Sequence, residues 1–576
     1  MKVKSARELN KLKREGEQKL FPRSIRIQVG TAPCGLSKGA QAVVTTLQKE
    51  LEKAGVEAAV VQVGCIGMCY AEPSVEVLIP GKPKLTYGNF TAEVVPSLVK
   101  ALSKGKVLKK NLLYRTNTEE LVINGKSLTY AAKIPADLKK TPAAKDFPFY
   151  SLQERITLRN AGLINPDSIE EYCARGGYAA LNKALTKMKP DQVIELVVKS
   201  NLRGRGGGGF PTGLKWKTCR EAKGKKKYVL CNCSEGDPGI GMHKSLIESD
   251  PHNILEGLTI GGYAIGAQEG FIYLHHGNEA AKEKLQTAIH QATEYGLLGT
   301  NIFGSGFNFT ITLKVGAGGY VCGESTALMA SLEGRAGEPR PKYIHTAEKG
   351  LWETPTNLNN VETWCNVPPI ISRGASWYTK IGTDGSKGTK VISLTGAVNR
   401  PCLAEVPMGT PLKKIITSLG GGVPKGSKLK AIQVGGPPAG ILPASGADLP
   451  VDFDALYNAG SMLGSGGLIV MDDSTCMVDM AKFFITFLEE ESCGRCLPCR
   501  EGIKRMKEIL DGISKAVGKE EDLTLLEELS KCLAQASLCD LGKSAPNSVL
   551  STLRHFRDEY LTHITKEVCP TKRCTM

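Results

Sequence analysis

The apolar and polar positions near the start of the chain follow two different periods. Residues 25–29 alternate in the manner of a strand, and residues 58–63 and 75–79 are short, largely apolar runs of strand length. Residues 39–54 and 92–102 instead place their apolar side chains at helical spacing. The pattern predicts a small α/β unit as the first domain.

The rest of the chain changes character several times. A proline-punctuated stretch follows the first unit, then a long glycine-rich segment, a β-rich stretch and a helical segment in which residues 506–534 have amphipathic spacing. We therefore predict an α/β multidomain protein without an internal repeat. The predicted boundaries are 1–108 for the first unit, 109–165 for an extended connector, 166–370 for the glycine-rich domain, 371–455 for the β-rich domain and 456–576 for the helical domain.

The amino-acid composition argues against nucleic-acid binding and against a membrane span. The 576 residues carry a formal net charge of +16, but aromatic residues make up only 6% and the lysines are scattered, so nucleic-acid binding is not predicted. A solvated lysine-rich surface explains the charge most simply, although it could meet an acidic partner such as a ferredoxin, or an anionic dinucleotide. No apolar run reaches the roughly 18 residues of a membrane span, and residues 1–20 lack the apolar core of a signal peptide. The 18 cysteines fall in short-spaced groups, which predicts reduced, metal-binding thiols in a cytoplasmic protein.

The most specific cysteine group is Cys493-Gly-Arg-Cys496-Leu-Pro-Cys499. Three thiolates at this spacing can bind three corners of one cubane iron–sulfur cluster. The fourth ligand must come from elsewhere, and Cys539 is the candidate because a helical hairpin over the intervening residues can bring it back to the other three. A zinc site built on Cys-x-x-Cys is the alternative, but we favour an electron-transferring [4Fe–4S] cluster.

The run 203–216, Arg-Gly-Arg-Gly-Gly-Gly-Gly-Phe-Pro-Thr-Gly-Leu-Lys-Trp, is the second strong signal. It formally contains Gly-x-Gly-x-x-Gly, but residues 191–200 before it have helical spacing, so a dinucleotide fingerprint of Rossmann type is disfavoured. Glycines still let backbone N–H groups wrap an anion closely, and Arg203, Arg205 and Lys215 add positive charge. A flexible linker is the alternative, and the embedded Phe-Pro and Lys-Trp pairs fit it badly.

Three further turns complete a set of hydrogen-bond donors that suits a ring system with many acceptors, ribityl hydroxyls and one phosphate. They are residues 227–239, where a strand runs into a polar turn, residues 315–326, a glycine loop before a helix, and residues 355–363, an asparagine-rich turn. Together and in order with the first glycine loop and the Cys-x-x-Cys-x-x-Cys motif, they resemble the NADH-binding flavoprotein subunit of complex I. The chain resembles more closely the homologous diaphorase subunit of multimeric, electron-bifurcating [FeFe]-hydrogenases and related transhydrogenases, over about residues 25–576.

The resemblance implies a fold and a set of roles. It implies a thioredoxin-like N-terminal domain, a Rossmann-like FMN-binding α/β domain, a ubiquitin-like β-grasp (SLBB) domain and a C-terminal helical bundle with the [4Fe–4S] cluster. It also implies hydride transfer to or from FMN followed by one-electron transfer through the cubane, with catalytic roles for Glu235 and Glu324. FMN or nucleotide contacts are implied for Gly204, Arg205, Gly206, Phe210, Lys215, Asn232, Ser234, Glu235, Tyr320, Gly323, Glu324, Ser325, Lys342, Asn359 and Asn360.

The sequence departs from the family on the dinucleotide side of the flavin. The family's Cys-Gly-Glu-Glu-Thr becomes Cys-Gly-Glu-Ser-Thr, so Ser325 replaces a carboxylate expected near the adenosine ribose. The family's Arg-x-Lys-Pro-Pro-Phe-Pro becomes residues 340–346, which keep Lys342 and add His345. Fewer acids and retained cations near the ribose favour NADP(H) over NAD(H). The alternatives are NAD(H) binding with a rebuilt loop and loss of dinucleotide binding.

Cys34, Cys65 and Cys69 lie at the ends of predicted strands, where loops can gather thiolates. The layout resembles the thioredoxin-like [2Fe–2S] ferredoxin domain, whose family supplies four cysteines in two close pairs. Here the second pair is intact, whereas Cys34 has no cysteine four or five residues further on. The sequence leaves open whether a [2Fe–2S] cluster binds, with Ser37 as a conceivable oxygen ligand.

The last two cysteines, Cys569 and Cys574, could join Cys476 and His563 in a closed zinc site with three sulfur ligands and one nitrogen ligand. The resemblance implies such a site at this junction. His563 is the least secure ligand, because His555 lies one helical stretch earlier. The remaining cysteines are interpreted as packing residues: Cys173, Cys219, Cys231, Cys233, Cys322, Cys365, Cys402 and Cys532.

We therefore predict an FMN-dependent NAD(P)H oxidoreductase (diaphorase) subunit that passes electrons between a pyridine nucleotide and iron–sulfur clusters. Because no terminal catalyst is evident, the expected partners are a second thioredoxin-like [2Fe–2S] subunit and, beyond it, a hydrogenase, formate dehydrogenase or second pyridine-nucleotide subunit. Electron bifurcation with ferredoxin is compatible with these motifs, which do not establish it. The alternative is a non-catalytic electron conduit or scaffold that has lost dinucleotide turnover.

Overall fold

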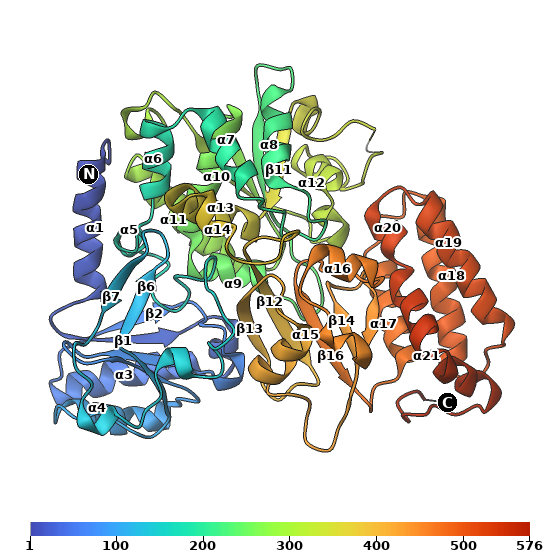
Figure 1. Cartoon of the computed structure of the whole chain (residues 1–576), viewed down its shortest axis with the longest axis horizontal. Coiled ribbons are helices and arrows are strands. Elements are labelled where there is room, and N and C mark those ends of the chain that lie inside the picture. Colours follow the sequence, from blue (N-terminus) through green and yellow to red (C-terminus); the bar gives the residue numbers. More distant parts are fainter. Residues whose placement is uncertain (1, 342, 576) are drawn as a thin grey trace.

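The computed structural model describes residues 2–341 and 343–575. Its regions follow one another roughly in chain order (Figure 1): an N-terminal sheet at the left, two further sheets in the middle and the C-terminal helices at the right. None of the helices in the two described ranges is long and apolar enough to cross a membrane.

The N-terminal sheet has five strands in the order β2–β1–β3–β4–β5, in which only β1 and β2 pair in parallel. The predicted strands and helices of this region are confirmed, but the sheet is not confined to residues 1–108. Strand β5 lies in the predicted connector, where it pairs with β4 and buries Tyr114. The elements are β1 (Ile25–Gly30), α2 (Pro33–Ser37), α3 (Ala40–Ala54), β2 (Ala58–Val63), β3 (Val75–Leu78), β4 (Lys84–Tyr87), α4 (Val95–Leu102), β5 (Leu112–Thr116) and the hairpin β6 (Thr118–Leu121) and β7 (Lys126–Thr129).

Helix α1 (Ala6–Leu20) packs with the central region and not with the N-terminal sheet. Its apolar residues Leu9 and Leu12 belong to the same core as Tyr172 of α5 (Ile169–Ala174), and Lys19 forms a 2.9 Å ion pair with Glu170. The core that α1 joins therefore lies outside the predicted first domain. An amphipathic pattern predicts that a helix buries one face but does not say against which core.

The central sheet consists of four parallel strands in the order β10–β9–β8–β11. The carboxyl ends of parallel strands meet at one edge, where open α/β sheets usually bind ligands. The predicted helix at residues 191–200 and the predicted strand at the start of residues 227–239 are confirmed as α7 and β8. The strands and helices are α6 (Ala179–Lys187), α7 (Pro190–Lys199), α8 (Thr212–Glu221), β8 (Tyr228–Cys233), α9 (Met242–Ser249), α10 (Pro251–Ile265), β9 (Glu269–Leu274), α11 (Glu279–Glu294), β10 (Thr310–Val315), α12 (Ser325–Leu332), β11 (Thr356–Asn360), α13 (Val361–Arg373) and α14 (Ala375–Tyr378).

The third sheet has five strands in the order β13–β12–β16–β14–β15. Its central strand β16 lies beyond the predicted boundary at residue 455, between β12 and β14, where Leu468 and Val470 are buried. The β-rich sheet therefore includes a strand from beyond the predicted boundary. Its elements are β12 (Thr389–Gly396), β13 (Cys402–Pro407), α15 (Leu412–Lys414), β14 (Leu429–Val434), β15 (Ile441–Pro443), α16 (Phe453–Asn458) and β16 (Gly467–Asp472).

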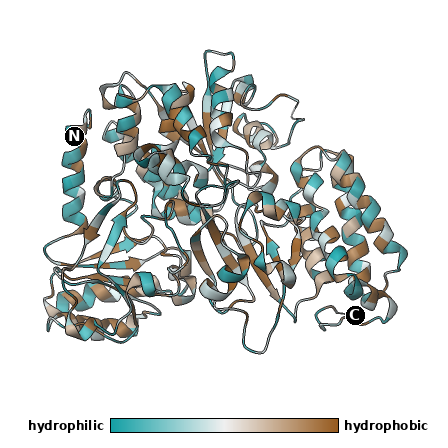
Figure 2. Ribbon diagram, viewed as in Figure 1, coloured by the Kyte–Doolittle hydropathy of each residue, from teal (hydrophilic) through white to brown (hydrophobic). Residues whose placement is uncertain are grey.

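The C-terminal region is helical, as predicted. The amphipathic stretch 506–534 forms two antiparallel helices, α18 and α19, whose turn contains Ala516 in a left-handed conformation (φ 60°). Both helices are banded teal and brown in Figure 2, because one face of each packs on its neighbours. The helices are α17 (Met477–Glu490), α18 (Leu497–Ser514), α19 (Glu521–Ala536), α20 (Asp540–Ser544) and α21 (Asn547–Thr565).

Candidate functional site

A cavity of about 410 Å³ lies at the carboxyl edge of the central sheet. Its walls come from the glycine loop before α8, from the ends of β8 and β11 and the segments that follow β8, β10 and β11, from loops of the β-rich region and from α20. Lys342 lies outside the described residues. The predicted contacts that line this cavity are Gly204, Gly206, Phe210, Lys215, Asn232, Ser234, Glu235, Tyr320, Gly323, Glu324, Ser325, Asn359 and Asn360.

The glycine loop reaches the cavity because it can adopt conformations that other residues rarely adopt. Gly207 and Gly209 have positive φ angles of 121° and 60°. A Cβ added to Gly206 would lie 3.2 Å from the Cβ of Asn360, so the loop backbone passes close to the end of β11. Lys215 links α8 to the same strand, because its Nζ donates a 2.5 Å hydrogen bond to the carbonyl of Leu358 in β11.

Arg205 was predicted to contact FMN, but its side chain does not line the cavity. It is fully buried, and its Nη2 donates to the Tyr378 hydroxyl at 3.1 Å. Its backbone N–H donates to Thr363 Oγ1 at 2.9 Å, which ties the glycine loop to α13. The motif located the loop correctly, whereas the direction of this side chain is set by packing against the β-rich domain, including the Phe453 ring.

The two predicted catalytic carboxylates are each held at a helix start. Glu235 accepts backbone hydrogen bonds from Met242 (2.9 Å) and His243 (3.0 Å) at the beginning of α9. Glu324 is the N-cap of α12 and accepts from the backbone of Thr326 (2.8 Å). These backbone N–H groups hold both carboxylates in position at the cavity wall.

The amide of Asn359 is the clearest sign that the cavity accepts a polar ligand. It is 3% exposed, lines the cavity, and neither its nitrogen nor its oxygen has a hydrogen-bond partner among the described residues. Unpartnered buried amides are rare in folded proteins. With the backbone N–H groups of the glycine loop and the cation of Lys215, this donor set fits a flavin ring and its phosphate.

Asp237 also lines the cavity, although the sequence did not single it out as a site residue. Burial raises its pKa to about 6, and nearby Glu235 acts in the same direction, while hydrogen bonds from Ser465 and Tyr320 limit the rise. Burial and the neighbouring Asp237 raise the pKa of the Tyr320 hydroxyl well above its usual value. Asp237 could have been predicted as a site residue, because it lies in the polar turn after β8 that the sequence analysis identified. Ser465 had none, because it reaches the cavity from the β-rich domain.

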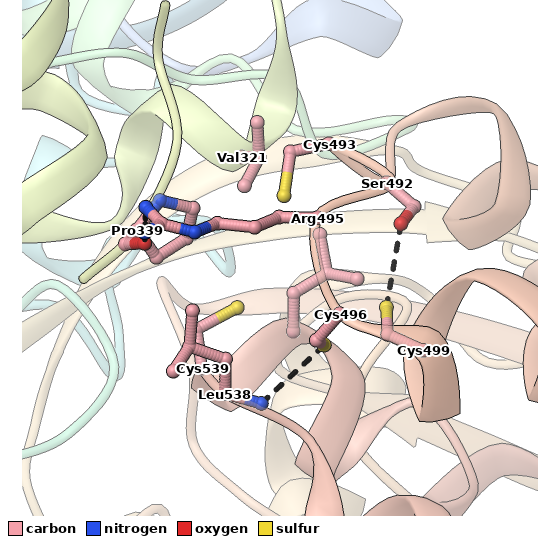
Figure 3. Close-up of a pocket in the computed structure, with 10 residues that line it drawn as sticks. Val321, Pro339, Ser492, Cys493, Arg495, Cys496, Cys499, Leu538 and Cys539 are labelled. Carbon is pink, nitrogen blue, oxygen red and sulfur yellow. Dashed lines mark hydrogen bonds between the residues drawn. The ribbon is translucent and has the colours of Figure 1, made fainter. Parts of the chain in front are cut away.

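The four predicted [4Fe–4S] ligands come together beside this cavity. Figure 3 shows Cys493, Cys496 and Cys499 facing Cys539 across one small hollow. The Ser492 hydroxyl lies 3.3 Å from Cys499 Sγ, and the backbone N–H of Leu538 donates to Cys496 Sγ at 3.5 Å. Four convergent sulfurs with polar donors around them fit a cubane cluster.

The cavity and the cysteine hollow are separated by one shared wall. Val321 and Leu541 line both of them. Across the same boundary, the backbone N–H of Tyr320 donates a 2.6 Å hydrogen bond to Glu491, two residues before Cys493. The geometry therefore places a flavin-sized site directly next to a cluster site.

The predicted zinc ligands also converge. The ligand atoms of Cys476, His563, Cys569 and Cys574 all lie within 4.8 Å of one another. His563 Nδ1 bonds to the carbonyl of Glu559 at 2.7 Å, which leaves Nε2 facing the thiols at 3.5 Å from Cys476 and 3.4 Å from Cys574. Burial opposes thiolate formation at Cys569, but backbone N–H donors outweigh it and lower its pKa to about 6. This donor set fits tetrahedral zinc.

At the N-terminus, Cys34, Cys65 and Cys69 lie near one another, and the Cys69 thiol is within hydrogen-bonding reach of both other thiols. Cys34 is exposed, while Cys65 is buried. The structure thus brings together every predicted cysteine group.

The fold and these sites define a protein that binds a flavin and an iron–sulfur cluster side by side. Family models for the Nuo51 FMN-binding domain, the SLBB domain and the NADH-ubiquinone oxidoreductase-F iron-sulfur binding region match residues 197–369, 391–442 and 479–563.

Two curated relatives and one solved structure extend this result. NADP-reducing hydrogenase subunit HndC of Solidesulfovibrio fructosivorans is 49% identical over 73% of this chain and 86% of its own. An NADH-quinone oxidoreductase subunit of Rhizobium meliloti is 45% identical over 72% of this chain and 99% of its own. An NAD+-reducing [NiFe]-hydrogenase in the H2-reduced state matches with a TM-score of 0.64 and 25% identity, over 97% of this chain and 90% of that chain.

The chain therefore belongs to the family of oxidoreductase flavoprotein subunits that includes HndC and this NADH-quinone oxidoreductase relative, with FMN and a [4Fe–4S] cluster as cofactors.

Proposed function

We propose that the chain is a diaphorase subunit that exchanges electrons between NADP(H) and a chain of iron–sulfur clusters. The observation that carries the proposal is the shared wall of Val321 and Leu541 between the cavity and the cysteine hollow. When bound, FMN accepts or donates a hydride and passes the two electrons on singly. Direct contact between the two sites keeps the one-electron step short.

The residues of the cavity have distinct proposed roles. Gly204, Gly206 and Lys215 hold the FMN phosphate, and Asn359 and Asn360 hold polar atoms of the flavin. Phe210, 58% exposed at the cavity, offers its ring face to the dinucleotide. Because backbone N–H groups at helix N-termini hold Glu235 and Glu324 in place, these two orient the nicotinamide. Asp237, a carboxyl with a pKa of about 6, is suited to hold a proton.

Ser325 supports NADP(H) as the nucleotide. It lies at the start of α12, and its hydroxyl donates a 3.0 Å hydrogen bond to Glu324. A second carboxylate at this position, as in the family's Glu-Glu pair, would face a 2′-phosphate with two adjacent negative charges. The hydroxyl of Ser325 removes one of these two charges. The name of the relative HndC, an NADP-reducing hydrogenase subunit, points the same way.

The test is anaerobic stopped-flow absorbance at the flavin band, with NADPH and NADH mixed separately. We expect NADPH to bleach the flavin faster. Ser325→Glu should lower the preference for NADPH by about tenfold, equivalent to about 1.4 kcal/mol. Ser376→Glu adds the same charge at an exposed position of α14 outside the cavity and should change nothing. Equal rates for both nucleotides in the wild type would contradict the proposed preference.

The second candidate function is a non-catalytic electron conduit. It is favoured by the altered segment 340–346, in which Tyr343 and Ile344 are exposed. The same experiment separates the two functions, because a conduit would show flavin bleaching with neither nucleotide while chemical reduction of its clusters persists.

The domain names and partners form part of the proposal. We assign the N-terminal sheet to a thioredoxin-like domain, the central sheet to a Rossmann-like domain, the third sheet to a ubiquitin-like β-grasp domain and the last helices to the cluster-binding domain. Cys34, Cys65 and Cys69 are assigned to a [2Fe–2S] cluster, and Cys476, His563, Cys569 and Cys574 to zinc. The partners are a thioredoxin-like [2Fe–2S] subunit and a hydrogenase, formate dehydrogenase or second pyridine-nucleotide subunit, with ferredoxin as the second acceptor in a bifurcating complex. A partner that co-purifies with the tagged chain from its native host would test this assembly.

A further inference from the structure

The three N-terminal cysteines come from separate pieces of backbone. Cys34 lies in α2, Cys65 follows β2, and Cys69 begins a short helical turn over residues 69–71. The backbone N–H of Gly67 donates to Cys65 Sγ at 3.1 Å. Convergent sulfurs with a backbone donor suit a binuclear iron–sulfur cluster, which needs four ligands. One ligand position is therefore left to a residue that is not one of these cysteines.

The carboxylate of Glu72 lies against this group. Glu72 is 2% exposed, and its Oε1 is 3.5 Å from Cys65 Sγ, while its Oε2 accepts a 2.7 Å hydrogen bond from the backbone of Ser74. A Cβ added to Gly35, the neighbour of Cys34, would lie 3.3 Å from Glu72 Oε2. The carboxylate is thus between the helix that carries Cys34 and the loop that carries Cys65.

Glu72 lacks the partner that a buried carboxylate normally has. Within the part of the chain that the structure describes, no lysine, arginine or histidine forms an ion pair with it. The cation in its surroundings, Lys38, directs its Nζ to the carbonyl of Cys69 at 3.1 Å. Buried carboxylates are usually either paired with a cation or bound to a metal. Because Glu72 lies beside three thiols that can bind a metal, it can bind that metal as well.

Two other residues could compete for the fourth position. Ser37 is exposed, and its hydroxyl donates to the carbonyl of Cys34 at 3.0 Å, so it is not directed at the thiols. Cys402 of β13 is buried close enough to Cys69 for the two thiols to influence each other, but it forms no hydrogen bond with Cys69 among the described contacts. Of these three candidates, Glu72 is the one for which the described hydrogen bonds place a side-chain oxygen on a sulfur of the group.

We propose that Glu72 is the fourth ligand of a [2Fe–2S] cluster held by Cys34, Cys65 and Cys69. This inference rests on the proposed assignment of a cluster to these three cysteines. A carboxylate carries the same charge as a thiolate but is a harder ligand, so the cluster keeps its total ligand charge while receiving less electron density from sulfur. The absorption and magnetic spectra of such a cluster differ from those of a four-cysteine cluster.

The test uses the full-length chain, purified without oxygen and loaded with isotopically enriched iron. Mössbauer spectra separate binuclear from tetranuclear iron, and electron paramagnetic resonance of the reduced protein reports the ligands. Glu72→Gln keeps the size of the side chain and removes its charge. We expect Glu72→Gln to lower the amount of binuclear iron relative to tetranuclear iron. Losing a residue that only supports the ligands of a metal site typically costs roughly 10–100-fold in affinity, and losing a ligand should cost at least as much. Glu72→Cys should restore the component with shifted g-values and a stronger sulfur-to-iron absorption.

Matched variants decide between the candidates. Ser37→Ala and Cys402→Ala should leave the binuclear spectrum unchanged. An unchanged spectrum in Glu72→Gln, or loss of the component in Cys402→Ala alone, would overturn the assignment of Glu72. A wild-type chain without binuclear iron would overturn the cluster itself. Flavin bleaching by NAD(P)H, measured on the same samples, should persist in Glu72→Gln, so a failure of the diaphorase proposal is recognised separately.

Discussion

The Ser465 hydroxyl donates a 2.9 Å hydrogen bond to Asp237 Oδ2, across 228 positions of sequence. Asp237 follows a strand of the central sheet, whereas Ser465 precedes the middle strand of the third sheet. Both line the cavity at the carboxyl edge of the central sheet. Beside them, Gly207 of the glycine loop pairs with Gly464 in an isolated β-bridge. The cavity is therefore closed by the contact between two sheets, and its electrostatics depend on both.

The raised pKa of Asp237 predicts a pH-dependent stability. The folded state binds this proton more tightly than the unfolded chain, whose carboxyl has the ordinary pKa of 3.8. The contribution to stability is therefore complete below about pH 4 and is lost as the pH rises through about 6. Asp237→Asn has no charge to bury and should be more stable than the wild type above pH 6, by on the order of 1–3 kcal/mol.

Thermal unfolding of the wild type and Asp237→Asn between pH 5 and 7.5 would measure this. We expect the difference in Tm to grow with pH. Ser465→Ala keeps the carboxyl but removes its donor, so it should be less stable than the wild type above pH 6. Parallel pH profiles for the wild type and Asp237→Asn would show that Asp237 keeps an ordinary pKa.

Two of the three asparagines of β11 offer a matched test of the proposed flavin site. Asn359 and Asn357 are both buried on the same strand without hydrogen-bond partners among the described residues, but only Asn359 lines the cavity. We expect Asn359→Ala to weaken FMN binding about tenfold, because a hydrogen bond to the flavin is lost. Asn357→Ala should leave it unchanged. FMN release on dilution, followed by flavin fluorescence, gives both affinities. Equal losses in the two variants would mean that general destabilisation explains the effect.

The sequence predicted most of the cavity because its motifs follow the strands of a parallel sheet. Glu235 comes after β8, Tyr320 after β10, and Asn360 ends β11, so each motif delivers its residues to the same edge. The cysteine groups were predictable for a similar reason, since short spacing and a helical hairpin limit where the thiols can lie. In these cases the local sequence pattern is enough to predict where the residues lie in the fold.

Other features depend on packing between regions, which a local pattern does not encode. Strand β16 is a short apolar run that could have belonged to any buried element, and its place between β12 and β14 follows from the sheet that surrounds it. Arg205 belongs to the glycine motif, yet its side chain turns toward Tyr378. Glu72 is one of many acidic residues in the sequence, and only its burial beside Cys65 distinguishes it.

A buried ion pair beneath the cavity should be critical for stability. Lys390 of β12 and Glu362 of α13 are both fully buried and bonded to each other, and Glu362 also accepts a 2.9 Å hydrogen bond from the backbone of Val391. Removing one partner leaves an unpaired charge, which costs about 3–5 kcal/mol. Glu362→Gln should therefore lower the Tm sharply. The double variant Glu362→Gln with Lys390→Met should recover part of the loss, and a larger loss in the double variant would contradict this account.

Zinc at the C-terminal cysteines should hold the tail against the last helices. Cys574 follows the final helix, and its Sγ lies 3.6 Å from Cys476 and 3.4 Å from His563. We expect metal analysis to find zinc in the wild type, and Cys574→Ser to lower its content at least tenfold while the tail becomes accessible to proteases. Cys532→Ser, at an exposed cysteine of α19, is the matched control and should retain full zinc. Equal zinc content in the two variants would show that the four residues pack together without binding a metal.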